Sequence, residues 1–78
     1  MPRYFFHIYN DAVIRDTQGE ELPDLNTARD EALQAARALI CLSVKKGHVN
    51  LNHRVEVVNE DGECIAAVPF RHAVTISS

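Results

Sequence analysis

The chain has 78 residues, 46% of them hydrophobic, and a formal net charge of −3, which fits one small globular domain, residues 1–78. The acidic balance argues against broad electrostatic binding to nucleic acid, and no apolar run approaches the length of a membrane span. The opening residues lack the pattern of a signal peptide, so we predict a cytoplasmic protein with two reduced cysteines.

The first predicted element is a strand from Arg3 to Tyr9, because RYFFHIY is short and rich in aromatic residues. Side chains alternate between the two faces of a strand. One face therefore carries Tyr4, Phe6 and Ile8, and the other carries Phe5, His7 and Tyr9. Both faces are largely apolar, which is typical of a central strand covered on two sides.

A hairpin and a loop follow this strand. Asn10-Asp11 is a turn signal, and the pattern predicts a short return strand over Ala12–Asp16. Residues Thr17–Glu21, which include Gly19, are predicted to be a polar loop.

The longest predicted element is a helix over Leu25–Lys46, where apolar residues recur at the helical period. Asp24 is the expected N-cap, with Asn26 as the competing choice, and Gly47 suits the left-handed position after the last turn. Small side chains over the first turns would let this helix lie close to a sheet. Its buried stripe is predicted to contain Ala28, Ala32, Ala35, Ala36, Leu39, Leu42 and Ser43.

Two more strands are predicted after a loop, over Arg54–Asn59 and Glu63–Val68. Asp61-Gly62 between them predicts a two-residue hairpin turn, which would place Val58 opposite Ile65. Pro69 should end the last strand, because it has no N–H group to donate. The pattern leaves open whether the chain beyond it forms a helical turn or an extended tail.

The predicted fold is therefore α+β, in the order β-β-α-β-β, with one long helix on a four-stranded antiparallel sheet. The chain direction after the helix favours the strand order 2-1-3-4. The helix, about 33 Å long, would extend beyond strands of about 23 Å, leaving Leu42 and Val44 in need of a partner. The predicted core contains Tyr4, Phe6, Ile8, Ala28, Ala32, Ala35, Leu39, Val55, Val57, Ala66 and Val68.

One helix cannot cover both faces of a sheet, and the uncovered face is predicted to be apolar. An exposed apolar face of this kind indicates an interface. We therefore predict a homodimer that forms through this face. Its predicted interface residues are Phe5, His7, Tyr9, Val58 and Ile65. The alternative is a monomer in which the segment Phe70–Ser78 folds back over the same face.

Three stretches together resemble a family of small bacterial proteins catalogued as a domain of unknown function. They are the opening MPRYFFH, LPDL before the helix, and VEVVNEDG followed by VPF. The resemblance implies a small β-β-α-β-β domain and supplies no catalytic residues. Separately, LPDL and the helix EALQAARALI resemble part of the HicB-type antitoxins, which have a hairpin followed by an amphipathic helix.

The residues that could carry chemistry do not form a recognised pattern. The four histidines lack the close spacing of a metal site, so we expect His7 to be a partly buried strand residue and the others to lie at the surface. Cys41 and Cys64 lack an activating arrangement, and Cys64 fits a small core residue. The acidic residues around the helix N-terminus fit a solvated helix end. We predict no catalytic residues, no cofactor and no metal ligands.

The predicted function is a non-enzymatic binding or regulatory module that acts as a homodimer and has a protein partner. One alternative is a HicB-like antitoxin that neutralises a ribonuclease, and a second is a small metal-binding protein. Nucleic-acid binding ranks below these, because Arg3, Arg54 and Arg71 would form only a sparse basic strip.

Overall fold

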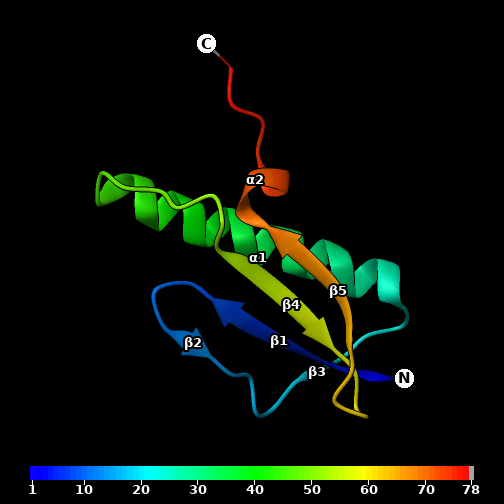
Figure 1. Cartoon of the computed structure of the whole chain (residues 1–78). Coiled ribbons are helices and arrows are strands. Elements are labelled where there is room, and N and C mark those ends of the chain that lie inside the picture. The colour runs from blue at the N-terminus through cyan, green and yellow to red at the C-terminus, as the bar shows by residue number, and fades with distance from the viewer. Residues whose placement is uncertain (78) are drawn as a thin grey trace.

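The structure is a computed structural model that describes residues 1–77, so Ser78, the end of the predicted tail segment, lies outside the described residues. One long helix lies across one face of a sheet, and the tail after the short second helix extends away from the body (Figure 1). The elements, in chain order, are β1 (Arg3–Tyr9), β2 (Val13–Ile14), β3 (Glu20–Glu21), α1 (Leu25–Lys45), β4 (Arg54–Val58), β5 (Cys64–Pro69) and α2 (Phe70–Ala73).

The sheet is antiparallel and has five strands, in the order β2-β1-β4-β5, with β3 also paired to β1. The predicted α+β class is confirmed, but the prediction of four strands was wrong. The missed strand, β3, pairs Glu20 and Glu21 with the beginning of β1. It forms because Gly19, with a positive φ of 71°, turns the chain back toward β1, and because Leu22 is buried just after it.

The return strand β2 is shorter than predicted, because Asp16 leaves the strand ladder. Only Val13 and Ile14 pair with β1. Farther along the same edge of β1, the Asp16 side chain replaces the missing strand as hydrogen-bond acceptor, and its Oδ2 accepts the Phe6 N–H at 3.1 Å. Asp16 thus bridges the gap between β2 and β3 on the edge of β1.

The turn between β4 and β5 is longer than the predicted two residues. The Gly62 N–H donates to Asn59 O at 3.1 Å, and Gly62 has a φ of 82°, which defines a three-residue loop ending in a left-handed residue. The Asn59 side chain also accepts the N–H groups of Asp61 and Glu63. This loop and an irregularity between Val57 and Val58 shift the register, so Val58 pairs with Cys64. The predicted pairing of Val58 with Ile65 was wrong.

Both ends of α1 agree with the sequence patterns. The Asp24 Oδ1 atom accepts the Thr27 N–H at 2.8 Å, which confirms Asp24 as the N-cap. At the other end the Gly47 and His48 N–H groups donate to the carbonyls of Val44 and Ser43, and Gly47 has a φ of 84°. This pair of bonds ends the helix at Lys45, one residue earlier than predicted.

The core lies between α1 and the sheet. Ala28, Ala32 and Ala36 are fully buried, so the small side chains do bring the helix close to β4. The predicted core residues Phe6, Ile8, Ala35, Leu39, Ala66 and Val68 are half-buried and pack against the buried cluster. Leu42 of the predicted buried stripe is 55% exposed, and the predicted core lacked five members of the buried cluster, which are Leu22, Ala36, Ile40, Phe70 and Ala73.

The short helix α2 explains the last two of these. Its Phe70 and Ala73 are buried, and Arg37 of α1 donates from Nε to Ala73 O at 2.8 Å. The chain after Pro69 is therefore a helical turn followed by an extended tail, and α2 packs against α1. Over the residues described, the chain after Pro69 does not fold back across the sheet face opposite α1.

Candidate functional site

The sheet face opposite α1, here called the open face, is the place of the predicted interface. Phe5, His7 and Tyr9 are half-buried there, and Val58 is only 8% exposed. The loop after β2 covers part of this face, since a Cβ atom on Gly19 would lie 2.9 Å from Phe5 Cε1. The fifth predicted residue, Ile65, is half-buried and packs against the core cluster.

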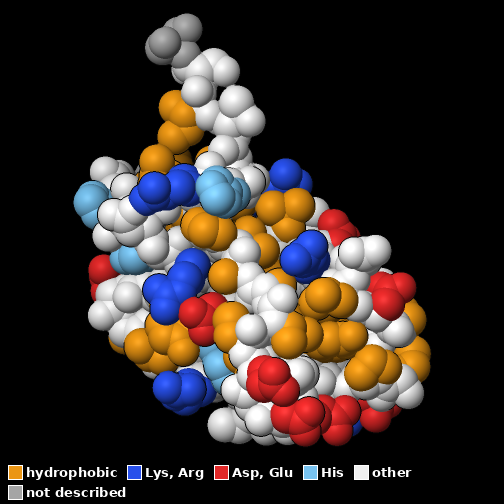
Figure 2. Space-filling view, turned by 45° about the vertical axis from the view of Figure 1, so that its right-hand side comes forward, with side chains coloured by type: hydrophobic (Ala, Val, Ile, Leu, Met, Phe, Trp, Pro, Cys, Tyr) orange, Lys and Arg blue, Asp and Glu red, His pale blue; other side chains and the backbone are white. Residues whose placement is uncertain are grey.

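Charged side chains also cover the open face. The Arg54 guanidinium carbon lies 4.2 Å from the centre of the Tyr9 ring, and Arg54 Nε bonds Glu56 Oε2 at 2.8 Å. Hydrophobic side chains in this region are separated by charged and neutral ones (Figure 2). The open face is therefore mixed in character, and dimerisation through it stays a prediction.

His7 and Asp16 form a polar network at the edge of β1. The Asp16 N–H donates to His7 Nδ1 at 3.0 Å, and the Asp16 carboxylate accepts the N–H groups of Phe6, Gln18 and Gly19. Partial burial raises the Asp16 pKa, but these three backbone bonds outweigh it and leave the pKa below its ordinary value. His7 is thus a half-buried, hydrogen-bonded strand residue, as its position in the sequence indicates.

The cysteines and the acidic residues lie at the surface. Cys64 is exposed, so its predicted place in the core was wrong, and Cys41 is exposed on α1. Partial desolvation and the nearby Glu56 carboxylate raise the pKa of the Cys64 thiol, which disfavours the reactive thiolate. Around the start of α1 the exposed acidic residues are Glu20, Glu21, Asp24, Asp30 and Glu31.

A cleft of about 300 Å³, lined by both polar and apolar side chains, lies at the C-terminal end of α1. His53 lies in it with its side chain 15% exposed, 3.5 Å from Asp11 Oδ1 and edge-on to the Phe70 ring. The prediction that His53 is a surface residue was therefore wrong, whereas His48 and His72 are exposed. Within residues 1–77, no group of three or more His, Cys, Asp or Glu side chains is arranged to hold a metal ion.

An apolar groove of about 370 Å³ lies beside this cleft, between the last turns of α1, the following loop and the C-terminal tail. Val44 is 60% exposed and Ile76 is 73% exposed. The helix length predicted the exposed end at Leu42 and Val44, but not the groove. The sequence signal for the groove, which the prediction missed, is the alternation of apolar residues in VNL at 49–51 and in VTI at 74–76. The groove is lined by Ile40, Val44, Val49, Leu51, Val74 and Ile76.

The groove has basic neighbours, although its lining residues carry no charge. Lys45 and Lys46 follow Val44 directly and are exposed. Arg71 lies on another side, where its Nε donates to Leu51 O at 3.5 Å. Acidic side chains gather instead at the end of the molecule opposite the C-terminal tail (Figure 2). The basic residues that the structure places close to the groove are therefore Arg71, bonded to the Leu51 carbonyl, and Lys46, which lines the adjacent cleft.

The outer edge of β5 is a third accessible feature. Among residues 1–77, no strand pairs with this edge, and β4 occupies the other one. Figure 1 shows β5 at one margin of the sheet. The six residues CIAAVP include no charged side chain, and Ala67 is exposed. Natural sheets usually protect such edges with charges, prolines, bulges or very short strands, and β5 has an irregularity at Ile65 and Pro69 at its end, so its unprotected part is residues 66–68.

These features define a small α+β domain with one long helix, two hollows at the end of that helix and an open sheet edge. The chain belongs to the family described as "Domain of unknown function (DUF6894)", which matches residues 3–71 and confirms the resemblance found in the sequence. No curated protein and no solved structure matches the chain, and similarity to the HicB-type antitoxins is not shown. Across residues 1–77, no helix has the length and hydropathy needed to cross a membrane.

Proposed function

We propose that this protein is a non-enzymatic protein-binding module, active as a homodimer, that holds an apolar and acidic segment of another protein in the groove at the end of α1. The observation that carries the proposal is the exposure of Val44 and Ile76 on both sides of an apolar groove. Exposed apolar surface of this kind is a common feature of protein-binding sites.

Charge selects the kind of partner. Arg71 is bonded to Leu51 of the groove and Lys46 lines the cleft beside it, so a segment that places acidic residues beside its apolar anchors would be attracted to it. A basic segment would be repelled by the same two residues. The groove of about 370 Å³ has room for a few side chains, which suits a short segment and moderate affinity.

The test compares two variants that place the same charge at similar exposure. Val44→Asp alters the groove, whereas Val13→Asp alters β2 at a position that is 53% exposed and outside the groove. Tagged wild type and both variants are used to capture proteins from the native host. We expect wild type and Val13→Asp to retain one stoichiometric partner, and Val44→Asp to lose most of it.

The chemistry of the retained partner completes the test. Limited proteolysis of the complex should protect a segment of the partner that is apolar and acidic. Equal retention by Val44→Asp would contradict the proposed groove. Recovery of a small basic toxin as the stoichiometric partner would favour the antitoxin alternative, because a basic protein does not fit the positive charge of Arg71 and Lys46.

A further inference from the structure

We infer that a second copy of the chain pairs antiparallel with the outer edge of β5, so that two five-stranded sheets join into one continuous sheet. The inference supplies an interface for the homodimer of the proposed function, but this edge lies outside the groove and the inference does not depend on what the groove binds. It rests on the backbone groups of β5, on the side chains at its two ends, and on the charges there.

The hydrogen bonds to β4 determine which β5 groups point outward. The Phe70 N–H donates to His53 O at 2.8 Å, and Arg54 pairs with Pro69, which has no N–H. Bonded and non-bonded pairs alternate along an antiparallel ladder. Val68 therefore bonds to β4, while the N–H and C=O groups of Ala67 turn away from the sheet.

The outward groups of Ala67 set the register of the second copy. In a symmetric antiparallel pair, Ala67 lies opposite Ala67 of the second copy, and the two residues exchange two hydrogen bonds. Ala67 is exposed and small, so no side chain blocks the approach. The contact residues on each side are then the uncharged side chains of β5.

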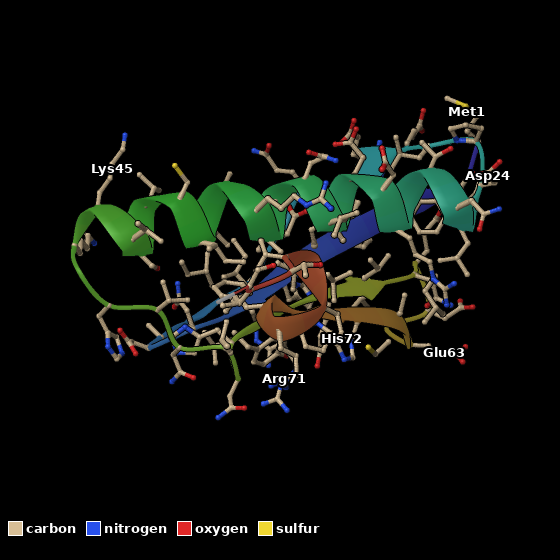
Figure 3. All side chains as sticks on the ribbon, turned by 90° about the horizontal axis from the view of Figure 1, so that it is seen from above. Met1, Asp24, Lys45, Glu63, Arg71 and His72 are labelled. Carbon is tan, nitrogen blue, oxygen red and sulfur yellow. The ribbon has the colours of Figure 1, made fainter. Side chains whose placement is uncertain are left out.

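The charges at the two ends of β5 fit this register. Glu63 and Arg71 lie at equal distances along the chain before and after Ala67. Glu63 precedes β5 by one residue and Arg71 lies in the first turn of α2, so the antiparallel pairing places the end of β5 that carries Glu63 beside the end that carries Arg71 in the other copy. In Figure 3, Glu63 lies beyond one end of β5, and Arg71 and His72 lie toward the other end, all on the side remote from α1.

Among residues 1–77, neither side chain has an oppositely charged partner to compete. Among the described residues, Glu63 and Arg71 take part in no ion pair. Arg71 instead donates hydrogen bonds to the neutral oxygens of Leu51 and Asn52. The dimer thus gains two opposite-charge contacts, although each chain has a net charge of −3.

The first experiment removes the outward donor. Ala67→Pro deletes an N–H that β4 does not use, and proline is tolerated at such edge positions. Ala67→Ser keeps the N–H and serves as the matched control. In sedimentation equilibrium, we expect wild type and Ala67→Ser to be dimers, and Ala67→Pro to be a monomer with an unchanged circular dichroism spectrum.

The second experiment reverses the charges. Glu63→Arg and Arg71→Glu should each raise the dimer dissociation constant roughly tenfold, because each change brings like charges together. The double variant should restore the wild-type value, since it re-forms both pairs with exchanged signs. This rescue would not occur if the single changes acted only on the fold of each chain.

Three outcomes would overturn the inference. The first is a wild type that stays monomeric at millimolar concentration. The second is a dimer that Ala67→Pro leaves intact, which would move the contact to the open face around Phe5. The third is a double variant whose dimer dissociation constant is raised by both charge reversals together instead of returning to the wild-type value.

Discussion

At the scale of single residues, the Asp16 carboxylate stabilises a part of the β1 edge that no strand covers. Its carboxylate occupies the gap between β2 and β3 and accepts three backbone N–H groups, among them that of Phe6 in β1. The edge of a central strand would otherwise present an unsatisfied donor there. One side chain thus replaces a section of strand that the sequence pattern had predicted.

Replacing this carboxylate should destabilise the protein in a pH-dependent way. Asp16→Asn keeps one acceptor oxygen but turns an NH₂ group toward the Phe6 donor, at a cost of about 1–2 kcal/mol after allowance for partial exposure. The Asp16 pKa is below its ordinary value of 3.8, so the ionised form stabilises the fold. That stability is complete above this value and is lost as the pH falls through 3.8 and below.

Urea unfolding at pH 7 and pH 3 measures the effect. The difference in unfolding free energy between wild type and Asp16→Asn should be largest at pH 7 and should shrink at pH 3. Asp30→Asn, at an exposed position on α1, is the control and should change stability little. A difference that is the same at both pH values would show that the charge of Asp16 is not what matters.

At the scale of elements, the contact between α1 and the sheet determines whether the chain folds. Ala32 is fully buried between the helix and the sheet, whereas Ala38 on the same helix is exposed. Ala32→Glu would place a charge in a site without water, at a cost of several kcal/mol. A domain of this size has little more stability than that to lose.

We therefore expect Ala32→Glu to abolish the cooperative thermal transition followed by circular dichroism. Ala38→Glu adds the same side chain to the same helix and should melt within a few degrees of wild type, because the new charge stays in water. If Ala32→Glu kept the wild-type melting temperature, the helix would be docked on another face.

The elements that could be predicted from the sequence are those with a strong local signal. The aromatic run gave β1 its observed bounds, and Asp24 and Gly47 marked the two ends of α1. β3 was missed because Glu20 and Glu21 carry no apolar alternation, and only pairing with β1 makes them a strand. The register at Ile65 was missed because loop length depends on the hydrogen bonds of Asn59, which the Asp-Gly pair does not report.

The candidate surfaces were harder to predict, because each depends on segments distant in sequence. The groove needs Val44, Val49 and Ile76 to meet, and only the folded chain brings them together. The open face looked apolar because strand alternation reveals nothing about Arg54 stacking on Tyr9 or about the loop at Gly19. The exposed end of α1 was predictable, since it follows from helix and strand lengths alone.

At the scale of the whole molecule, a chain near the lower size limit should be stabilised by its second copy. Association makes the melting temperature depend on protein concentration, by roughly 5 °C or more across a hundredfold range for a domain of this size. We expect this dependence in the wild type and in Ala67→Ser, and a constant melting temperature in Ala67→Pro. Scanning calorimetry at several concentrations measures it, and a wild-type value independent of concentration would contradict dimerisation.

The position of β1 also has a consequence for biosynthesis. The first strand to leave the ribosome is central in the finished sheet, and its long partner, β4, pairs Val58 with Phe5 from the other end of the chain. During translation, β1 can acquire only the short strands β2 and β3 until most of the protein has been made. Its apolar side chains therefore stay exposed until β4 has been made, and the sheet closes late in the synthesis of this domain. A nascent chain stalled before β4 would therefore be the form of this protein most exposed to chaperones and to aggregation.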